Sequence, residues 1–121
     1  MIYGLGQQQT GKVNQRNQKL FLRNQNMSIC IPFIHSIKGY ALYWDNYSPT
    51  TFVDNPQEMS FDSEVGDCAD YYFIYGGNAD KVIANVRKLT GQAPLYPLWA
   101  LGFWQCRERY KSPDELCEVV D

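Results

Sequence analysis

The sequence of 121 residues contains few of the side chains on which many catalytic and metal sites depend. It has a single histidine, His35, and none of its four cysteines forms a CxxC pair. A structural zinc site needs four closely spaced nitrogen or sulfur ligands, so we expect no metal and no cofactor. A serine or cysteine nucleophile would have only His35 as its base, and because His35 lies among alternating apolar residues we interpret it as structural.

An excess of charge of one sign and a long apolar run are also missing. Eleven Lys and Arg against 13 Asp and Glu give a formal net charge of -2, which leaves no basic surface for phosphate backbones or anionic lipids. Apolar stretches end well short of the roughly 18 residues that span a bilayer, and the N-terminal residues do not resemble a signal peptide. We expect neither nucleic acid nor membrane as a partner.

The cysteines are too few to indicate a disulfide-dependent fold. With 45% hydrophobic and 15% aromatic residues, a chain of this length can bury one core without covalent cross-links. Two disulfides in three pairings are conceivable, but we predict free, mostly buried thiols at Cys30, Cys68, Cys106 and Cys117.

Aromatic and β-branched residues are abundant, in short runs separated by Gly, Asn, Asp and Pro. Such regular spacing predicts a β-sandwich, with a polar loop over residues 6–19 and a hairpin turn at Lys38-Gly39. The run Tyr40–Asp45 is bulky on both faces, which predicts cover on both sides. The predicted strands are Ile2–Leu5, Lys19–Arg23, Ser28–Ile37, Ala41–Asn46, Thr51–Val53, Met59–Glu64 and Tyr71–Tyr75.

After Gly77 the apolar period becomes helical, which predicts a helix from Asn78 to Leu89 that ends at Gly91. A connector with two prolines follows, then the apolar run Trp99–Trp104, which is typical of a strand buried on both faces. Ser112 to Glu115 has the spacing of a capping box. The helix it begins has barely two turns, so we expect the natural sequence to continue beyond Asp121.

Three patterns have both a chemical and a structural interpretation. Residues 6–12 fit the start of a phosphate-binding loop, but Val13 stands where a hydroxyl must hold magnesium. The acid pairs could be a glycosidase acid and base, yet acids in turns are usually solvated or bonded locally. The aromatic residues could stack on sugar rings or pack in the core. The acid pairs are Asp45/Asp54, Asp62/Glu64 and Asp67/Asp70, and the aromatic residues include Trp44, Trp99, Trp104, Tyr47 and Tyr110.

Several short segments, in collinear order over nearly the whole chain, together resemble glycoside hydrolase family 31. The aromatic segment Trp44–Tyr47 and the segment Trp104–Tyr110 are most similar to bacterial α-xylosidases of that family. The segments that carry the resemblance are Tyr3–Gln7, Gly39-Tyr40, Trp44–Asn46, Asp70–Ile74, Leu89–Gly91 ahead of Pro94 and Pro97, and Trp99–Tyr110.

The resemblance implies a fold that is mainly β: part of an antiparallel β-sandwich, then a helix and the first β/α unit of a (β/α)8 barrel. It divides the chain into sandwich strands over residues 1–77, a linking helix and connector over 78–97, and the start of the barrel over 98–121. In the family, two aspartates on later barrel strands perform retaining hydrolysis of α-glycosides. The resemblance places no catalytic residue here, so we expect no activity from this chain alone. The compartment stays open, with bacterial cytoplasm and periplasm both compatible.

The resemblance also implies two places that contact an oligosaccharide substrate. The loop after the first barrel strand lies where barrel enzymes build their sites, and a sandwich loop reaches over the barrel. Many members carry an acid on that sandwich loop, which here is shorter and has none, leaving neutral hydrogen bonds from asparagine. The predicted substrate-binding residues are Asn24, Asn26, Gln105, Arg107, Arg109 and Tyr110.

Two other interpretations compete with this one. The chain could be a self-contained carbohydrate-binding β-sandwich module, or an interaction domain without a ligand. A module has no use for a buried strand that leads into a capped helix, whereas a barrel requires one. If the segment Trp99–Trp104 lacks neighbours and sheet edges are unpaired, we expect self-association through these edges, or disorder beyond Pro97.

Overall fold

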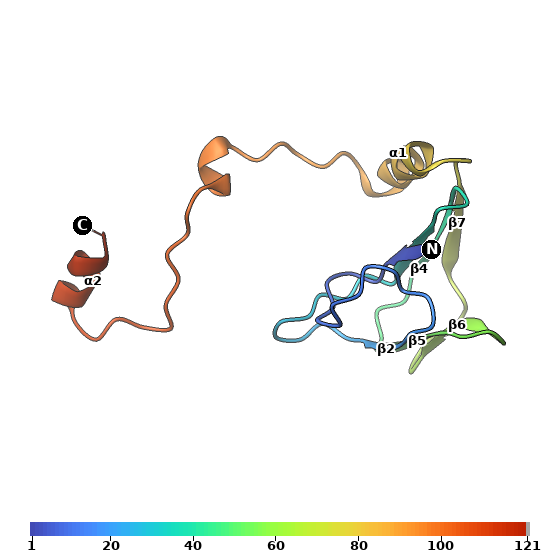
Figure 1. Ribbon diagram of the computed structural model, residues 1–121, viewed down its shortest axis with the longest axis horizontal. Helices are drawn as coiled ribbons and strands as arrows, with labels where there is room; N and C mark the ends of the chain where they lie inside the picture. The colour runs from blue at the N-terminus through green and yellow to red at the C-terminus, as the bar shows by residue number, and fades with distance from the viewer. Residues whose placement is uncertain (121) are drawn as a thin grey trace.

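The computed structural model describes residues 1–120 and consists of a two-sheet sandwich, one helix packed on it, and a C-terminal stretch that extends away from both (Figure 1). The mainly β fold expected from the sequence is confirmed. Both sheets are antiparallel throughout, and every predicted strand up to Tyr75 has a counterpart.

One sheet has four strands and the other has three, and the chain alternates between them. The order is β1-β3-β4-β7 in the larger sheet and β2-β5-β6 in the smaller. Strand β4 lies between β3 and β7, with Ala41 opposite both His35 and Ile74. The strands are β1 (Ile2–Gly4), β2 (Lys19–Leu22), β3 (Phe33–Ser36), β4 (Tyr40–Trp44), β5 (Thr50–Asp54), β6 (Met59–Ser63) and β7 (Tyr71–Tyr75).

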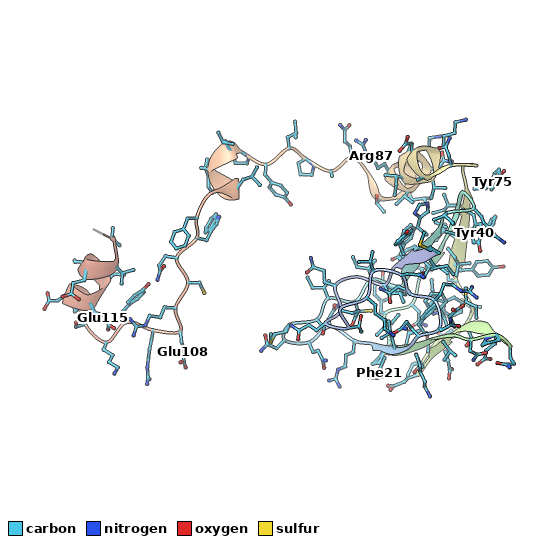
Figure 2. The ribbon with its side chains drawn as sticks, viewed as in Figure 1. Phe21, Tyr40, Tyr75, Arg87, Glu108 and Glu115 are labelled. Carbon is cyan, nitrogen blue, oxygen red and sulfur yellow. The ribbon has the colours of Figure 1, made fainter. Side chains whose placement is uncertain are left out.

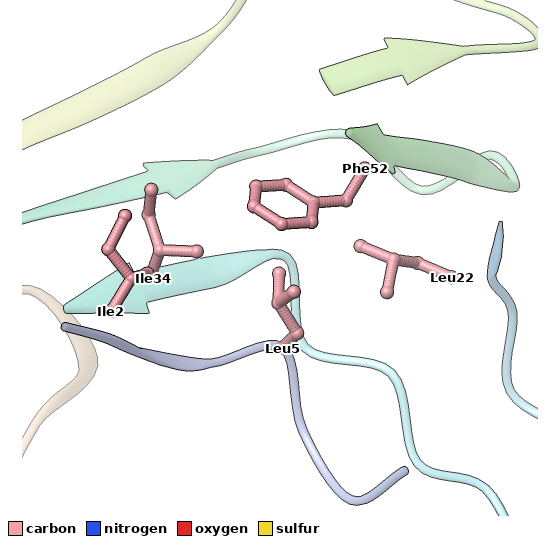
Figure 3. Packing of buried hydrophobic residues seen from close by; sticks show 5 residues of the cluster. All are labelled: Ile2, Leu5, Leu22, Ile34 and Phe52. Atoms are coloured by element: carbon pink, nitrogen blue, oxygen red, sulfur yellow. The ribbon is translucent and has the colours of Figure 1, made fainter. Parts of the chain in front are cut away.

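The space between the sheets holds the main hydrophobic core. Side chains from three strands and the turn after β1 meet around Phe52, which is fully buried (Figure 3). The Phe52 ring also contacts Phe61 at a centroid distance of 5.1 Å, and Phe61 in turn stacks on Trp44 at 6.1 Å. The buried members of this cluster are Ile2, Leu5, Leu22, Ile34 and Phe52.

Helix α1 (Ala79–Thr90) covers the outer face of the larger sheet. The Asn78 side chain accepts a hydrogen bond from the Lys81 N–H at 3.0 Å, and Gly91 ends the helix with a φ of 85°. Val82 is buried against Ala41 and Ile74. Strand β4 is thus covered by a sheet on one face and a helix on the other, and both the helix and the two-sided cover agree with the sequence predictions.

Two glycine turns meet at the end of the larger sheet. The predicted turn at Gly39 has a φ of 80°, and its carbonyl accepts the N–H groups of Gly76 and Gly77 at 3.0 and 2.9 Å. A Cβ atom on Gly39 would lie 2.3 Å from the Gly77 carbonyl carbon. Only glycine allows both the backbone conformation and this approach.

The polar loop between β1 and β2 is held by a buried acid at the end of β5. Asp54 accepts the Asn17 N–H at 2.6 Å, pairs with Arg16 at 3.1 Å, and donates its own N–H to Gln18. Its side chain is 1% exposed. A carboxylate that accepts a backbone N–H on one oxygen and faces an arginine with the other can be buried in this way, and it ties the loop to the smaller sheet.

Two predicted strands differ from the structure. The run Ser28–Ile37 forms a strand only over β3, because Pro32 has no N–H to donate and the residues before it make only isolated bridges. The run Trp99–Trp104 forms no strand: Leu98–Leu101 is a short 3-10 helix, η1, and Trp99 is 70% exposed. A parallel strand receives its hydrogen bonds from neighbours, and residues 1–120 place none beside this segment, so local bonds replace them.

The cysteines are free, as predicted, but not mostly buried. Cys30 is partly buried, while Cys68, Cys106 and Cys117 are exposed. Burial raises the pKa of the Cys30 thiol. The other three lie in the connection before β7 and in the C-terminal stretch, outside the hydrophobic clusters, so the burial expected from their residue type is not reached.

The described residues contain no helix that is both long and apolar enough to cross a membrane. Between residues 1 and 120, no group of three or more His, Cys, Asp or Glu side chains is arranged to hold a metal ion. His35 lies on β3, and its Nε2 atom is buried with no hydrogen-bond partner among these residues. Within residues 1–120 no hydroxyl or thiol is therefore hydrogen-bonded to this Nε2 atom as a nucleophile would be.

Candidate functional site

The predicted substrate-binding residues lie in two separate parts of the structure. Asn24 and Asn26 are in the loop that follows β2 of the sandwich. The other four lie between η1 and α2 (Pro113–Val120), around Glu108 at the far end of the extended stretch (Figure 2). The structure does not bring the two groups together, and each is described by its own contacts.

Asn24 is held by the backbone of its own loop. Its Oδ1 atom accepts the Cys30 N–H at 2.7 Å, and its Nδ2 group has no protein partner among the described residues. Asn26 lies at the exposed tip, where the backbones of Gln25 and Ser28 exchange two hydrogen bonds. Asn24 is therefore positioned to present a donor, whereas Asn26 is a solvent-facing turn residue.

A cavity of about 280 Å³ opens beside Asn24, between the loop after β2 and the segment that follows β4. Polar and apolar groups both line it, and the two rims come from different sheets. Its main polar members are Arg23, Asn24, Asp45, Asn46 and Ser48, and its apolar ones include Leu22, Pro32, Tyr43, Tyr47 and Pro49.

Asp45 provides the negative charge of this cavity, and Arg23 the positive one. Its backbone N–H donates to the Asp70 carbonyl at 3.0 Å, and its Oδ1 atom accepts the Tyr43 hydroxyl at 3.4 Å. The second carboxylate oxygen has no protein partner within residues 1–120. Burial, and then the charge and hydrogen bond of Asp45, raise the pKa of the Tyr43 hydroxyl.

The segment after Asp45 is stiffened by an asparagine turn. The Asn46 Oδ1 atom accepts both the N–H and the hydroxyl of Ser48 at 2.7 Å, and its Nδ2 group donates to the Val65 carbonyl. Tyr47, at the middle of the turn, is fully exposed. Its ring therefore stands beside the cavity without packing on anything, in contrast to most aromatic residues of the sandwich.

A second cavity adjoins the first at Tyr43 and Asp45. It has a volume of about 490 Å³ and lies between the outer face of the larger sheet and the end of α1. Tyr43 and Tyr72 stack along it at a centroid distance of 6.0 Å. Its walls are largely apolar, with Ile31, Phe33, Ile74, Val86 and Leu89 among them.

The C-terminal loop is organised by Arg107, Tyr110 and Glu115. Arg107 forms an ion pair with Glu115 and lies 5.5 Å from the centre of the Tyr110 ring, while Gln105 donates to the Tyr110 hydroxyl at 3.2 Å. Glu108 and Arg109 are exposed. Among residues 1–120 Glu108 forms no ion pair, and the ion pair that holds this loop joins Arg107 to Glu115.

The same glutamate takes part in the predicted helix cap. The Glu115 N–H donates to Ser112 Oγ at 3.2 Å, as a capping box requires. Its carboxylate accepts the Lys111 N–H at 2.7 Å, one residue earlier than expected. Glu115 thus joins the start of α2 to the loop that carries Arg107.

Two other candidate motifs have structural roles. Asp54, one of the paired acids, forms an ion pair with Arg16 and accepts the Asn17 N–H, and so holds the loop before β2. The phosphate-loop pattern leads into polar loop and not into a helix, and Gly6 packs so closely that a Cβ atom would lie 2.1 Å from the Ile29 carbonyl oxygen. Sequence reasoning gave Asp45 no binding role; the signal available was its place in the segment Trp44–Tyr47.

Comparison with known proteins places these features in a family. Residues 1–54 match the sequence profile of the glycosyl hydrolase 31 N-terminal galactose mutarotase-like domain. The chain is 47% identical over 117 residues to an α-xylosidase of Saccharolobus solfataricus. This match covers 97% of this chain and 16% of that protein. It is 30% identical to an uncharacterized family 31 glucosidase of Pseudescherichia vulneris, in a match that covers 98% of this chain and 22% of that protein. It is 29% identical to α-xylosidase A of Aspergillus niger, in a match that covers 95% of this chain and 16% of that protein.

The chain therefore spans about a sixth to a fifth of the length of these relatives. The matches run through the sandwich, helix α1 and the C-terminal stretch alike, and they include the segments in which the family resemblance was noted. The chain belongs to glycoside hydrolase family 31.

Proposed function

We propose that these residues serve in a retaining α-glycoside hydrolase, specifically an α-xylosidase that removes terminal α-xylosyl residues, or α-glucosyl residues, from oligosaccharides. In this proposal the sandwich and α1 support a catalytic barrel that begins at residue 98, and the two catalytic aspartates lie outside residues 1–121. The chain alone then has no hydrolytic activity, because positioning groups without a nucleophile give a negligible rate.

The observation that carries the proposal is the 47% identity to the Saccharolobus α-xylosidase over almost the whole chain. The exposure of Trp99, Phe103 and Trp104 adds physical support. These large apolar side chains form no core in this chain, which is what a barrel strand separated from its neighbouring strands would show.

The C-terminal loop has a specific role in the proposal. Arg109 and Tyr110 face the leaving-group side of the sugar site, where an arginine can hold hydroxyls and a tyrosine ring can stack. Arg107, paired with Glu115 and packed on Tyr110, positions that ring, and Gln105 orients its hydroxyl. Asn24 and Asn26 add neutral hydrogen bonds from the sandwich.

A chimera tests the proposal directly. The aligned 117 residues of the Saccharolobus α-xylosidase are replaced by this chain, and hydrolysis of p-nitrophenyl α-xyloside is measured beside the 121-residue chain alone. We expect the chimera to be active and the chain alone inactive. A chimera that folds but lacks activity would argue against the proposal, as would turnover by the chain alone that is lost on mutation of one of its own carboxylates.

The same chimera tests the loop. Alanine at Arg109 or Tyr110 should lower kcat/KM by about tenfold, equivalent to about 1.4 kcal/mol of transition-state stabilisation. Alanine at Glu108, which is exposed like Arg109, is the control. Unchanged kinetics with a lower melting temperature would assign Arg109 and Tyr110 to the scaffold.

A carbohydrate-binding module is the second candidate, favoured by the exposed ring of Tyr47 beside a polar cavity. Titration calorimetry of the chain with xylo-oligosaccharides and α-glucans distinguishes the two. Micromolar affinity supports a self-contained module, whereas the hydrolase proposal expects no binding of that strength.

A further inference from the structure

We propose that the cavity between Asn24 and Asp45 binds one pyranose ring of a neutral oligosaccharide. The site is distinct from the C-terminal loop and is formed by the sandwich alone. The choice of α-xylosides and α-glucosides as ligands rests on the proposed function, but the site itself rests on the four groups described next.

The first two groups are a donor and an acceptor that the protein leaves unused. The Asn24 Oδ1 atom is taken by the Cys30 N–H, so its orientation is set and its Nδ2 group remains free to donate. Asp45 accepts the Tyr43 hydroxyl on Oδ1 and keeps Oδ2 free. Among residues 1–120 neither free group has a partner, and both residues line one cavity.

This pair suits the chemistry of a sugar. Adjacent ring hydroxyls can each donate to a carboxylate and accept from an amide N–H, and hydrogen bonds to a charged group are the stronger ones. The loop after β2, which carries Asn24, has no acid of its own. Asp45, directly after β4, supplies the negative charge that this loop lacks. The Tyr43 hydroxyl donates to the carboxylate and so helps to orient it.

The third group is the ring of Tyr47. Its full exposure leaves a flat apolar face at the rim of the cavity, anchored by the Asn46 turn on which it stands. Such a face can cover the C–H side of a pyranose while polar groups bind its edge. Arg23, on the opposite rim, adds donors for a further hydroxyl.

The size and charge of the cavity limit the ligand. A volume of about 280 Å³ is below the usual range for drug-sized ligands, so it suits a single ring. Asp45 disfavours anions and Arg23 disfavours cations, which leaves a neutral polyol ring. With one ring and few contacts, we expect a dissociation constant of about 1 to 10 mM.

The test is a titration of the 15N-labelled 121-residue chain with methyl α-xylopyranoside and methyl α-glucopyranoside, followed through its amide resonances. We expect saturable shifts at residues 22–24, 30 and 43–48, and no such shifts with glycerol at equal concentration. Absence of saturable shifts at these residues, shifts centred elsewhere, or equal shifts with glycerol would overturn the site.

The variants are chosen to keep the fold. Asp45→Asn retains an acceptor for Tyr43 but replaces the free acceptor by a donor, and Asn24→Asp retains the acceptor for the Cys30 N–H but removes the free donor. Tyr47→Ala removes a ring that packs on nothing. Each should weaken binding about fivefold or more, while Asp62→Asn, an exposed carboxylate on β6, should leave it unchanged.

Wild-type affinity in Asp45→Asn and Asn24→Asp would refute the proposal. If one variant fails to fold, the other and Tyr47→Ala still decide the question. The outcome is separable from the hydrolase proposal. If the chimera is active but the 121-residue chain shows no saturable shifts, only this sugar site is refuted. If the 121-residue chain binds the sugar but the chimera is inactive, only the hydrolase proposal is refuted.

Discussion

Replacing Phe52 by alanine tests whether the contact between the two sheets is the main source of stability. Phe52 is fully buried, contacts the other members of the core cluster, and packs on Phe61. Losing about 100 Å² of buried apolar surface costs about 2.5 kcal/mol. A residual cavity of about 80 Å³ adds about 2 kcal/mol, for a total of about 4 to 5 kcal/mol.

Urea unfolding followed by Trp44 fluorescence measures this loss. Trp44 reports on the contact because it stacks on Phe61 and its indole N–H donates to Ser63 at 2.8 Å. With a typical slope of about 2 kcal/mol per molar urea, the midpoint should fall by about 2 M. Trp99 and Trp104 are exposed before unfolding and contribute a nearly constant background.

Phe73→Ala is the matched control. Phe73 is 61% exposed and stacks only on Tyr40 at 5.6 Å, so its removal should cost less than about 1 kcal/mol. If Phe52→Ala and Phe73→Ala lowered the midpoint equally, the sandwich core would not hold the fold together as described, and the reasoning would fail.

Three further predictions follow from the turns, the titratable groups and the sheet edges. Gly11→Ala should cost about 1 kcal/mol because Gly11 has a positive φ, and Gly39→Ala should cost well over that because an added Cβ atom would also clash with the backbone of Gly77. Equal urea midpoints for the two variants would contradict this. Because the folded pKa of Tyr43 is raised, the free energy of unfolding should fall as pH rises above about 10, and less so in Tyr43→Phe; identical profiles of the two proteins would refute the assignment. The unpaired edge of β7 and its exposed aromatic side chains should promote association of copies, so light scattering should give a mass that grows with concentration, and a monodisperse monomer at all concentrations would count against it.

The parts of the fold predictable from sequence are those set by local chemistry or by the two-faced pattern of one strand. Asn78 and Gly91 predicted the ends of α1 because caps act within one turn of the chain. The bulk on both faces of Tyr40–Asp45 predicted that something covers each side. Both depend on neighbours in sequence, and both agree with the structure.

The parts that could not be predicted depend on distant partners. Trp99–Trp104 has the composition of a buried strand, but a strand exists only where other strands supply its hydrogen bonds. Asp54 resembles any acid before a turn, and its burial depends on Arg16 and on Asn17, which lies 37 residues earlier in the chain. Likewise, Asp45 and Asn24 share a cavity only because two loops from different sheets meet, which no spacing in the sequence expresses.

The alternation of the chain between the two sheets has a kinetic consequence. β1 pairs with β3, and β2 pairs with β5. A strand of the smaller sheet, β2, therefore lies in sequence between β1 and β3, and two more, β5 and β6, lie between β4 and β7 of the larger sheet. Only β3-β4 and β5-β6 are local hairpins, and these are the pairings expected to form first. Neither sheet can then be finished without the other, so we expect residues 1–75 to fold and unfold in one concerted step, and a protease cut anywhere between β2 and β6 to release both sheets at once. A cut after Thr90, by contrast, removes no strand from either.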